Sequence, residues 1–448
     1  MQRGQFSSRW AFVLAASGSA VGLGNIWGFP TNAAENGGAA FLLAYLLLAF
    51  LLAYPALMAE LIIGRHAQAN MVTALEGLSP TALAKRVGRA TGIAGVVTAS
   101  AILCFYSIIA GWMIAYLLQP VAILAAQADV AEWLTTFSLP RNVLFTGLFL
   151  LLTGAVIAAG VANGIEKWSR RLMPSLFVLL LLLIGYVLVQ PGAEEGLRHY
   201  LVPDFSQLGD PQLLVSALGQ AFFSMSLGVG TMLIYGSYIS REENLPRLGV
   251  LVTLTDTSVA FLAGLLVLPA MFVAKQIGVE IYADGNNLIA GPDLIFQVLP
   301  ALFEQMGAAG LWVAASFFLL MSIAALTSSI SMLEVPVAFV TERFNVARQP
   351  ATLVTIALLF VVAITIAANF EVLFGWVVSL STETAQPLLG MMLCLYAGWL
   401  FQRDKLLAEI KSGNPHAQYQ LFWRIWPFYI RFICPALIIL MLADQWLN

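Results

Sequence analysis

The chain has 448 residues, of which 60% are hydrophobic and only 10% are charged, and its formal net charge is −3. A soluble multidomain enzyme of this composition would have too few polar residues to cover its surface. Apolar runs recur from Trp10 to Leu447 with short polar breaks, and a transmembrane helix needs about 20 such residues. The sequence therefore predicts an all-α polytopic membrane protein.

The apolar runs predict about eleven transmembrane helices. Their expected ranges are 10–34, 38–64, 89–119, 142–161, 169–190, 213–239, 247–274, 308–341, 350–368, 375–402 and 425–445. The first and sixth contain segments rich in Gly and Ser, at 17–25 and 224–230, which favour backbone that leaves the helix. Unwound backbone in a bilayer is tolerated only where it lines a protected polar cavity, so we expect a binding site there. The alternative is that these glycines merely allow close helix packing.

The two interrupted helices open two groups of five helices. This spacing favours two repeats of inverted topology, at 10–190 and 213–402, with an additional helix at 425–445. The whole chain, 1–448, is then a single domain.

The distribution of basic residues predicts the orientation in the membrane. Short loops that remain in the cytoplasm retain Lys and Arg, and with the N-terminus inside, the outer loops carry only Arg141, Arg198 and Lys275 of the 21 Lys and Arg residues. We therefore expect a multi-pass protein of the bacterial inner (plasma) membrane, with a cytoplasmic N-terminus and a periplasmic or extracellular C-terminus.

Several short motifs carry a resemblance to a known family. The run Gly-Ser-Ala-Val-Gly-Leu-Gly-Asn-Ile-Trp-Gly-Phe-Pro at 18–30 resembles the first helix of the neurotransmitter:sodium symporter family, and further matches follow in order at 106–112, 164–168, 219–230 and 326–330. The length resembles the bacterial amino-acid transporter branch with eleven helices. The resemblance implies sodium-coupled symport of a small amino acid into the cell by alternating access.

The resemblance implies a substrate site at the two helix breaks. The substrate carboxylate would meet backbone N–H groups of helix 1 and the Tyr106 hydroxyl, and its ammonium would face the carbonyl groups of Ala20, Phe223 and Ser226. The largely apolar lining favours a neutral side chain of moderate to large size. The implied contact residues are Ser19, Ala20, Leu23, Gly24, Ile102, Tyr106, Phe223, Ser224, Ser226, Val229, Ser328 and Met332.

The resemblance also implies two sodium ions, which prefer oxygen ligands. The first site would use Ala20, Asn25, Ser224 and Asp256 together with the substrate carboxylate, and a shared ligand makes the two bindings reciprocal. The second would use the carbonyls of Gly18, Val21 and Ala324 and the hydroxyls of Thr327 and Ser328. Alternatively, these two hydroxyls only bond back to the preceding turn of their own helix.

Asp256 also bears on chloride. Chloride-dependent members have Asn at this position and Ser one turn later, where this chain has Ala260. The fixed carboxylate would replace the anion, so the resemblance implies transport that does not need chloride.

The resemblance implies gates on both sides of the substrate. At the inner mouth Arg3 and Glu342 would pair beside the aromatic ring of Phe6. At the outer side Tyr106 and Phe223 would cover the substrate.

The outer gate departs from the family pattern. Gly28 and Phe374 stand where an Arg and an Asp usually pair, which predicts an apolar outer seal that includes Phe374. Glu383 in helix 10 either bonds to a neighbouring polar group or faces the space left by the missing Arg, where it would favour a substrate with an extra donor.

Other classes of function fit less well. An intramembrane enzyme is disfavoured because no nucleophile or zinc motif occurs, and the three cysteines lie far apart in apolar runs. An ion channel is disfavoured because the chain has no repeated filter loop. A proton-coupled transporter of the same architecture is the closest alternative. The expected partners are a small amino acid and the lipid bilayer, with no nucleic acid and no obligatory protein partner.

Overall fold

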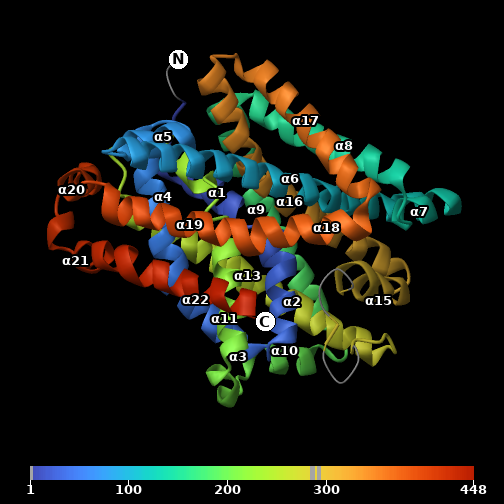
Figure 1. Ribbon diagram of the computed structural model, residues 1–448. Coiled ribbons are helices and arrows are strands. Elements are labelled where there is room, and N and C mark those ends of the chain that lie inside the picture. The colour runs from blue at the N-terminus through green and yellow to red at the C-terminus, as the bar shows by residue number, and fades with distance from the viewer. Residues whose placement is uncertain (1–3, 283–287, 290–293, 448) are drawn as a thin grey trace.

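The computed structural model describes residues 4–282, 288–289 and 294–447, which form a bundle of long helices (Figure 1). The elements of the N-terminal part are α1 (Arg9–Ala20), η1 (Gly24–Gly28), α2 (Phe29–Glu35), α3 (Ala39–Leu48), η2 (Ala49–Ala53), α4 (Tyr54–Ala67), α5 (Met71–Leu78), α6 (Ala82–Leu124), α7 (Ala128–Thr135), α8 (Leu139–Ala158), η3 (Val161–Glu166), α9 (Lys167–Leu188) and α10 (Ala193–Leu201). Here η marks a short π- or 3₁₀-helical turn.

The second part begins after α10. Its elements are η4 (Phe205–Gly209), α11 (Pro211–Ser224), α12 (Thr231–Gly236), α13 (Leu245–Gln276), η5 (Leu294–Val298), α15 (Leu299–Gln305), α16 (Ala308–Phe344), α17 (Arg348–Ala368), α18 (Phe370–Val378), η6 (Ser379–Ala385), α19 (Gln386–Leu395), η7 (Tyr396–Leu400), α20 (Arg403–Ser412), η8 (Ala417–Tyr419), α21 (Leu421–Phe428), η9 (Tyr429–Ile433) and α22 (Cys434–Leu447).

Each of the eleven expected ranges contains helix. Within the described residues, eight helical stretches are long and apolar enough to cross a membrane, or ten if each of two bent pairs counts as one span. The sixth expected helix is not among these spans, because it is divided into α11 and α12, on either side of residues 225–230. The number of eleven spans therefore stays a prediction, whereas the all-helical membrane fold is confirmed.

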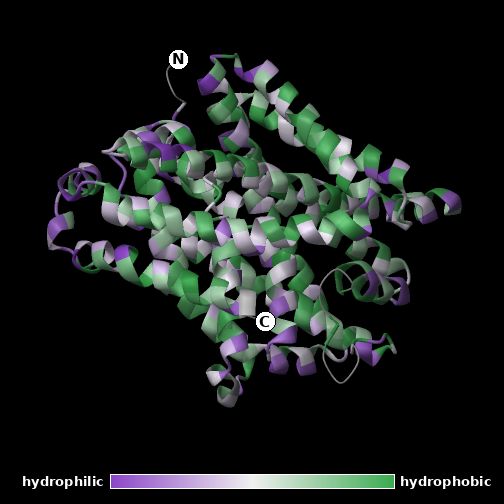
Figure 2. Cartoon of the chain, in the orientation of Figure 1, coloured by the Kyte–Doolittle hydropathy of each residue, from purple (hydrophilic) through white to green (hydrophobic). Residues whose placement is uncertain are grey.

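The outside of the bundle is apolar along the helices and polar at their ends. Figure 2 shows hydrophobic residues along most helices and hydrophilic residues gathered at helix ends, for example around α20 at the left edge. Large apolar side chains such as Val372 and Trp312 are 74% and 69% exposed. A surface of this kind suits a lipid environment, where backbone groups are satisfied inside each helix.

The break in the sixth helix depends on left-handed backbone. Gly228 and Gly230 have φ values of 89° and 81°, and Ser226 has a φ of 53°, a region that glycine adopts without steric cost. The side chain of Glu60 in α4 replaces the missing helical partners: its Oε1 accepts a hydrogen bond from Gly228 N at 2.6 Å and its Oε2 accepts one from Leu233 N at 3.2 Å. Glu60 thus supports the unwound backbone of this break.

A buried ion pair holds α4 to α20. Arg65 is fully buried, its Nε lies 2.7 Å from Glu409 Oε1, and its Nη1 donates to the Glu243 carbonyl at 2.7 Å. The α20 helix is bent by 103° from the preceding helical stretch Phe370–Leu400, and it lies beyond the expected transmembrane range 375–402. Burial alone raises the pKa of Glu409, but hydrogen bonds with His66 and Arg65 and the charge of Arg65 outweigh it, so the pKa is lowered. This stabilisation is therefore present at neutral pH and is lost as the pH falls through the lowered pKa.

We predict that Glu409→Gln destabilises the protein, because the buried Arg65 guanidinium loses its counter-charge. The expected cost is about 3–5 kcal/mol, measured as a lower midpoint of thermal unfolding in detergent at neutral pH. Glu132→Gln, at an exposed position in α7, is the control and should leave the midpoint unchanged. Equal midpoints for the two variants would contradict the prediction.

Candidate functional site

The break in the first helix is fixed by close contacts that only glycine allows. The α1 helix ends at Ala20, Val21 is extended, and the following segment is bent by 54° from α1. A Cβ atom at Gly22 would lie 2.3 Å from Ser328 Oγ and 2.9 Å from Tyr106 Oη. The freed backbone finds side-chain partners: Gly22 N donates to Asn25 Oδ1 at 3.1 Å, and Leu23 N donates to Tyr106 Oη at 3.1 Å.

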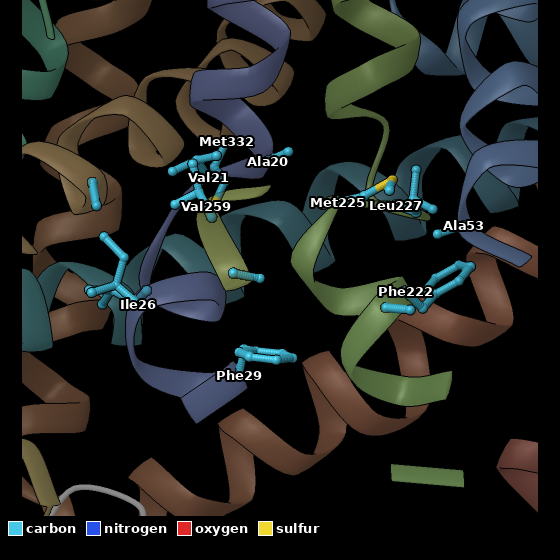
Figure 3. Packing of buried hydrophobic residues seen from close by; sticks show 14 of the residues in the cluster. Ala20, Val21, Ile26, Phe29, Ala53, Phe222, Met225, Leu227, Val259 and Met332 are labelled. Atoms are coloured by element: carbon cyan, nitrogen blue, oxygen red, sulfur yellow. The ribbon is translucent and has the colours of Figure 1, made fainter. Parts of the chain in front are cut away.

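The two breaks lie next to each other. Figure 3 shows Ala20 and Val21 at the end of α1 beside Met332, and Met225 and Leu227 at the gap between α11 and α12. Ser226 Oγ of the second break donates to the Ser19 carbonyl of the first at 3.1 Å, so a direct hydrogen bond joins them.

A small central cavity of about 20 Å³ lies at these breaks. Its lining includes every predicted substrate-contact residue except Ser19, and it also includes Gly22 and Gln386, which were not predicted. The lining residues are Ala20, Gly22, Leu23, Gly24, Ile102, Tyr106, Phe223, Ser224, Ser226, Val229, Ser328, Met332 and Gln386. Backbone groups and hydroxyls come from the broken helices, whereas Ile102, Val229 and Met332 supply an apolar wall.

Ser19 and the Ser226 carbonyl make different contacts from those expected. Ser19 Oγ donates to Ser331 Oγ at 2.6 Å, because its side chain is directed to α16 rather than to the cavity. The Ser226 carbonyl accepts the Thr231 hydroxyl at 2.7 Å, which satisfies one of its lone pairs.

Two predicted ligands of the first ion, Asn25 and Ser224, bond to one buried carboxylate. Asp256 is fully buried in α13 and accepts hydrogen bonds from Asn25 Nδ2 at 2.7 Å and from Ser224 Oγ at 2.9 and 3.0 Å. Tyr45 Oη, which sequence reasoning missed, donates to Asp256 Oδ2 at 3.2 Å. The carboxylate and the hydroxyl oxygens of Ser224 and Tyr45 form a donor set that fits a hard cation. The Asn25 amide oxygen instead accepts a hydrogen bond from Gly22 N.

The predicted ligands of the second ion also come together, between α1 and α16. Thr327 Oγ1 lies 3.4 Å from the Val21 carbonyl and 3.0 Å from the Ala324 carbonyl. Ser328 Oγ lies 3.5 Å from the Gly18 carbonyl and 3.2 Å from that of Val21. Thr327 also bonds back to its own helix, whereas the hydrogen bonds of the Ser328 hydroxyl cross to α1. These five oxygens belong to carbonyl and hydroxyl groups, which are uncharged ligands that suit a hard cation.

At the inner mouth, Phe6 is buried and its ring lies 5.8 Å from that of Tyr235. Glu342 Oε2 accepts two hydrogen bonds from Asn70, each at 2.8 Å. Arg3, the expected partner of Glu342, lies outside the described residues.

Two further groups of hydrogen bonds, which were not anticipated from the sequence, lie near this mouth. Ser7 donates to Glu166 of η3 through its backbone N–H at 2.9 Å and through its hydroxyl. Glu334 of α16 accepts hydrogen bonds from Tyr238 Oη at 2.5 Å and Arg348 Nη1 at 3.0 Å. The sequence feature that could have indicated the Ser7 contact is the motif at 164–168, which contains Glu166 and lies at the start of helix 5.

At the expected outer gate the rings form an aromatic cluster and not a charged pair. Phe374 stacks on Phe370 with 4.4 Å between ring centroids, and Phe370 lies 5.5 Å from Trp112. Trp112 in turn lies 5.4 Å from Phe296. The predicted apolar character fits this arrangement, but Trp112, Phe296 and Phe370 were not anticipated.

Glu383 does not face the cavity in this structure. It is exposed, whereas Gln386, three residues later, lines the cavity. The reason is the π-helical turn η6, in which the extra residue changes the faces on which successive side chains lie.

Comparisons with known proteins agree with this geometry. Residues 3–137 and 134–447 match the sodium:neurotransmitter symporter family. An uncharacterised sodium-dependent transporter, YhdH, of Bacillus subtilis is 34% identical, with 98% of this chain and 97% of the relative covered. The human sodium- and chloride-dependent taurine transporter is 29% identical over 71% of this chain and 58% of its own length.

A solved structure is similar over nearly the whole length. The crystal structure of MhsT in complex with L-phenylalanine has a TM-score of 0.85 and 35% identity, and the likeness covers 99% of this chain and 100% of that one. With the family match over both parts of the chain, this leads to one conclusion: the chain is a membrane transporter of the sodium:neurotransmitter symporter family.

Proposed function

We propose that this chain couples the inward movement of a neutral amino acid to two sodium ions by alternating access. The observation that carries the proposal is the overlap between the cavity and the ion sites. Ala20 and Ser224 belong to the cavity lining and to the first ligand set, and Ser328 belongs to the lining and to the second. Residues shared in this way make the affinity for substrate depend on the ions, and the reverse.

We also propose how the two repeats move during the transport cycle. The repeats at 10–190 and 213–402 would move relative to each other about the central cavity, with the helix at 425–445 beside them. The N-terminus would be cytoplasmic and the C-terminus periplasmic or extracellular. In reconstituted vesicles, uptake of neutral amino acids should stop when sodium is replaced by choline at constant pH, and uptake that persists would favour proton coupling.

We predict that Asp256→Ala weakens sodium and substrate binding together. The variant removes the carboxylate on which Asn25, Ser224 and Tyr45 converge, so both apparent affinities should fall by about tenfold or more. Equilibrium binding of radiolabelled amino acid at several sodium concentrations measures both. Thr255→Ala is the control, because its hydroxyl bonds only within its own helix in the described structure. Normal substrate binding by Asp256→Ala at low sodium would count against the shared site.

We predict that transport does not need chloride. The Asp256 carboxylate already supplies negative charge beside Tyr45 and Ser224, and Ala260 offers no hydroxyl one turn later. Replacing chloride by gluconate at constant sodium should leave the initial rate of uptake unchanged. A collapse of uptake in gluconate would show that an anion is required after all.

Gln386 narrows the proposed substrate class. Its side chain is 1% exposed, it lines the cavity, and its Oε1 has no hydrogen-bond partner among the described residues. A buried acceptor without a partner is costly. Gly228 allows this part of helix 10 to lie close to the second break, because a Cβ atom at Gly228 would lie only 2.2 Å from the Gln386 carbonyl oxygen. We therefore propose a substrate whose side chain carries an uncharged donor, such as a hydroxyl or an indole N–H.

We predict that hydroxyl-bearing amino acids bind about tenfold better than their apolar counterparts. Competition for sodium-dependent uptake would compare threonine with valine and tyrosine with phenylalanine. Gln386→Leu should abolish the preference in both pairs, whereas Met332→Leu, on the apolar wall, should keep it. If the ratios are the same in Gln386→Leu as in the unaltered protein, the role of Gln386 is refuted while sodium coupling stands.

A further inference from the structure

A second cavity lies between η7 and the start of α20 on one side and α21 and η9 on the other. It has a volume of about 210 Å³ and shares no lining residue with the central cavity. The α20 and α21 helices that border it are at the left edge of Figure 1. Its walls combine arginine side chains with aromatic rings, which is unlike the central site.

Three arginines line this cavity, and no acidic residue does. They are Arg403, Arg424 and Arg431. Within the described ranges none of them forms a salt bridge, and the ion pairs of the chain lie elsewhere. Three guanidinium groups around one space repel each other unless an anion lies between them.

Neighbouring groups hold the positions of two of these side chains. Arg431 Nε donates to the Gly398 carbonyl at 2.8 Å, and its guanidinium carbon lies 4.7 Å from the centroid of the Trp399 ring. Arg403 lies in the same way over Trp423, at 5.8 Å. The close approach of the two helices requires Gly398, since a Cβ there would lie 2.9 Å from the Arg431 Cα. The guanidinium groups are thus partly ordered before any ligand binds.

The rim of the cavity is apolar and open to the outside of the bundle. Phe428 and Phe432 are 59% and 44% exposed, and their ring centroids are 5.1 Å apart. Trp399, 55% exposed, lies 5.3 Å from Phe432. Arg431 itself lies within a stretch that is apolar enough to span a membrane, where a cation is costly without a partner. Cations beside an exposed apolar rim fit a ligand that has an anionic head and hydrocarbon chains.

We propose that this cavity binds the phosphate of an anionic phospholipid of the inner leaflet, with the acyl chains along Phe428 and Phe432. Guanidinium groups bind phosphate oxygens through paired, charge-assisted hydrogen bonds. Basic pockets between transmembrane helices on the cytoplasmic side are suited to such headgroups. Free inorganic phosphate shares the headgroup chemistry, but it would leave the aromatic rim without a role.

The test measures lipid retained by the full-length purified protein. Native mass spectrometry from detergent micelles with added phosphatidylglycerol or phosphatidylcholine should show selective retention of phosphatidylglycerol. Arg424→Gln and Arg431→Gln should each weaken this retention about tenfold. Arg86→Gln, which removes an exposed cation of α6 outside the cavity, is the matched control and should retain the lipid as the unaltered protein does.

A second measurement separates the lipid from a free anion. Phosphatidylglycerol should raise the midpoint of thermal unfolding of the unaltered protein, whereas inorganic phosphate and glycerol phosphate should not. Arg424→Gln is expected to fold normally, because its exposed side chain makes no hydrogen bond in the described structure, so it can decide the matter even if Arg431→Gln is unstable. Equal retention of the two lipids, equal retention by Arg424→Gln and the unaltered protein, or equal protection by inorganic phosphate would overturn the proposal.

Discussion

A peptide group that leaves a helix inside a bilayer has no water to bond, so the protein itself must satisfy its N–H and carbonyl. In this chain side chains do so at both breaks. Asn25 and Tyr106 accept hydrogen bonds from the first break, and both oxygens of Glu60 accept hydrogen bonds from the second. The central cavity exists because these partners allow two helices to stop at the same depth.

The same constraint brings the proposed ion sites and the proposed substrate site together. Carbonyl groups freed from α1 point toward the hydroxyls of α16, and the Asn25 amide points toward Asp256. An unwound segment thus offers oxygen atoms in several directions within a few ångströms. A cation and a small zwitterion can both use them, which is why coupling in such a protein needs no separate transmission element between sites.

The helix ranges could be predicted because apolar runs of membrane length have few alternative structures. The breaks at 17–25 and 224–230 could be predicted because glycine and hydroxyl residues at that density disfavour a continuous helix. The cavity lining followed from the family motifs, since the residues of those motifs are set by the backbone geometry of the breaks.

Helix 10 shows why the rest could not be predicted. Residues three apart share a face of an α-helix, so Glu383 and Gln386 were not distinguishable by pattern. The π-helical turn at Ser379–Ala385 separates them, leaving Glu383 exposed and Gln386 at the cavity. A single inserted residue in the hydrogen-bond ladder leaves no clear mark in an apolar sequence. The ring of Phe296 was missed for a related reason, because η5 lies between the expected helices 7 and 8, where no structure was anticipated.

The contact between Ser7 and Glu166 joins the N-terminal segment to the turn that begins helix 5. Gly160, with a φ of 85°, precedes this turn and gives it conformational freedom. If Ser7 departs, Glu166 loses a donor to each of its oxygens and keeps, among the described residues, only the more distant Arg170 Nη1, 3.6 Å from Oε1, so the carboxylate would recruit water. A movement that releases the N-terminal segment would therefore also draw water to the start of helix 5.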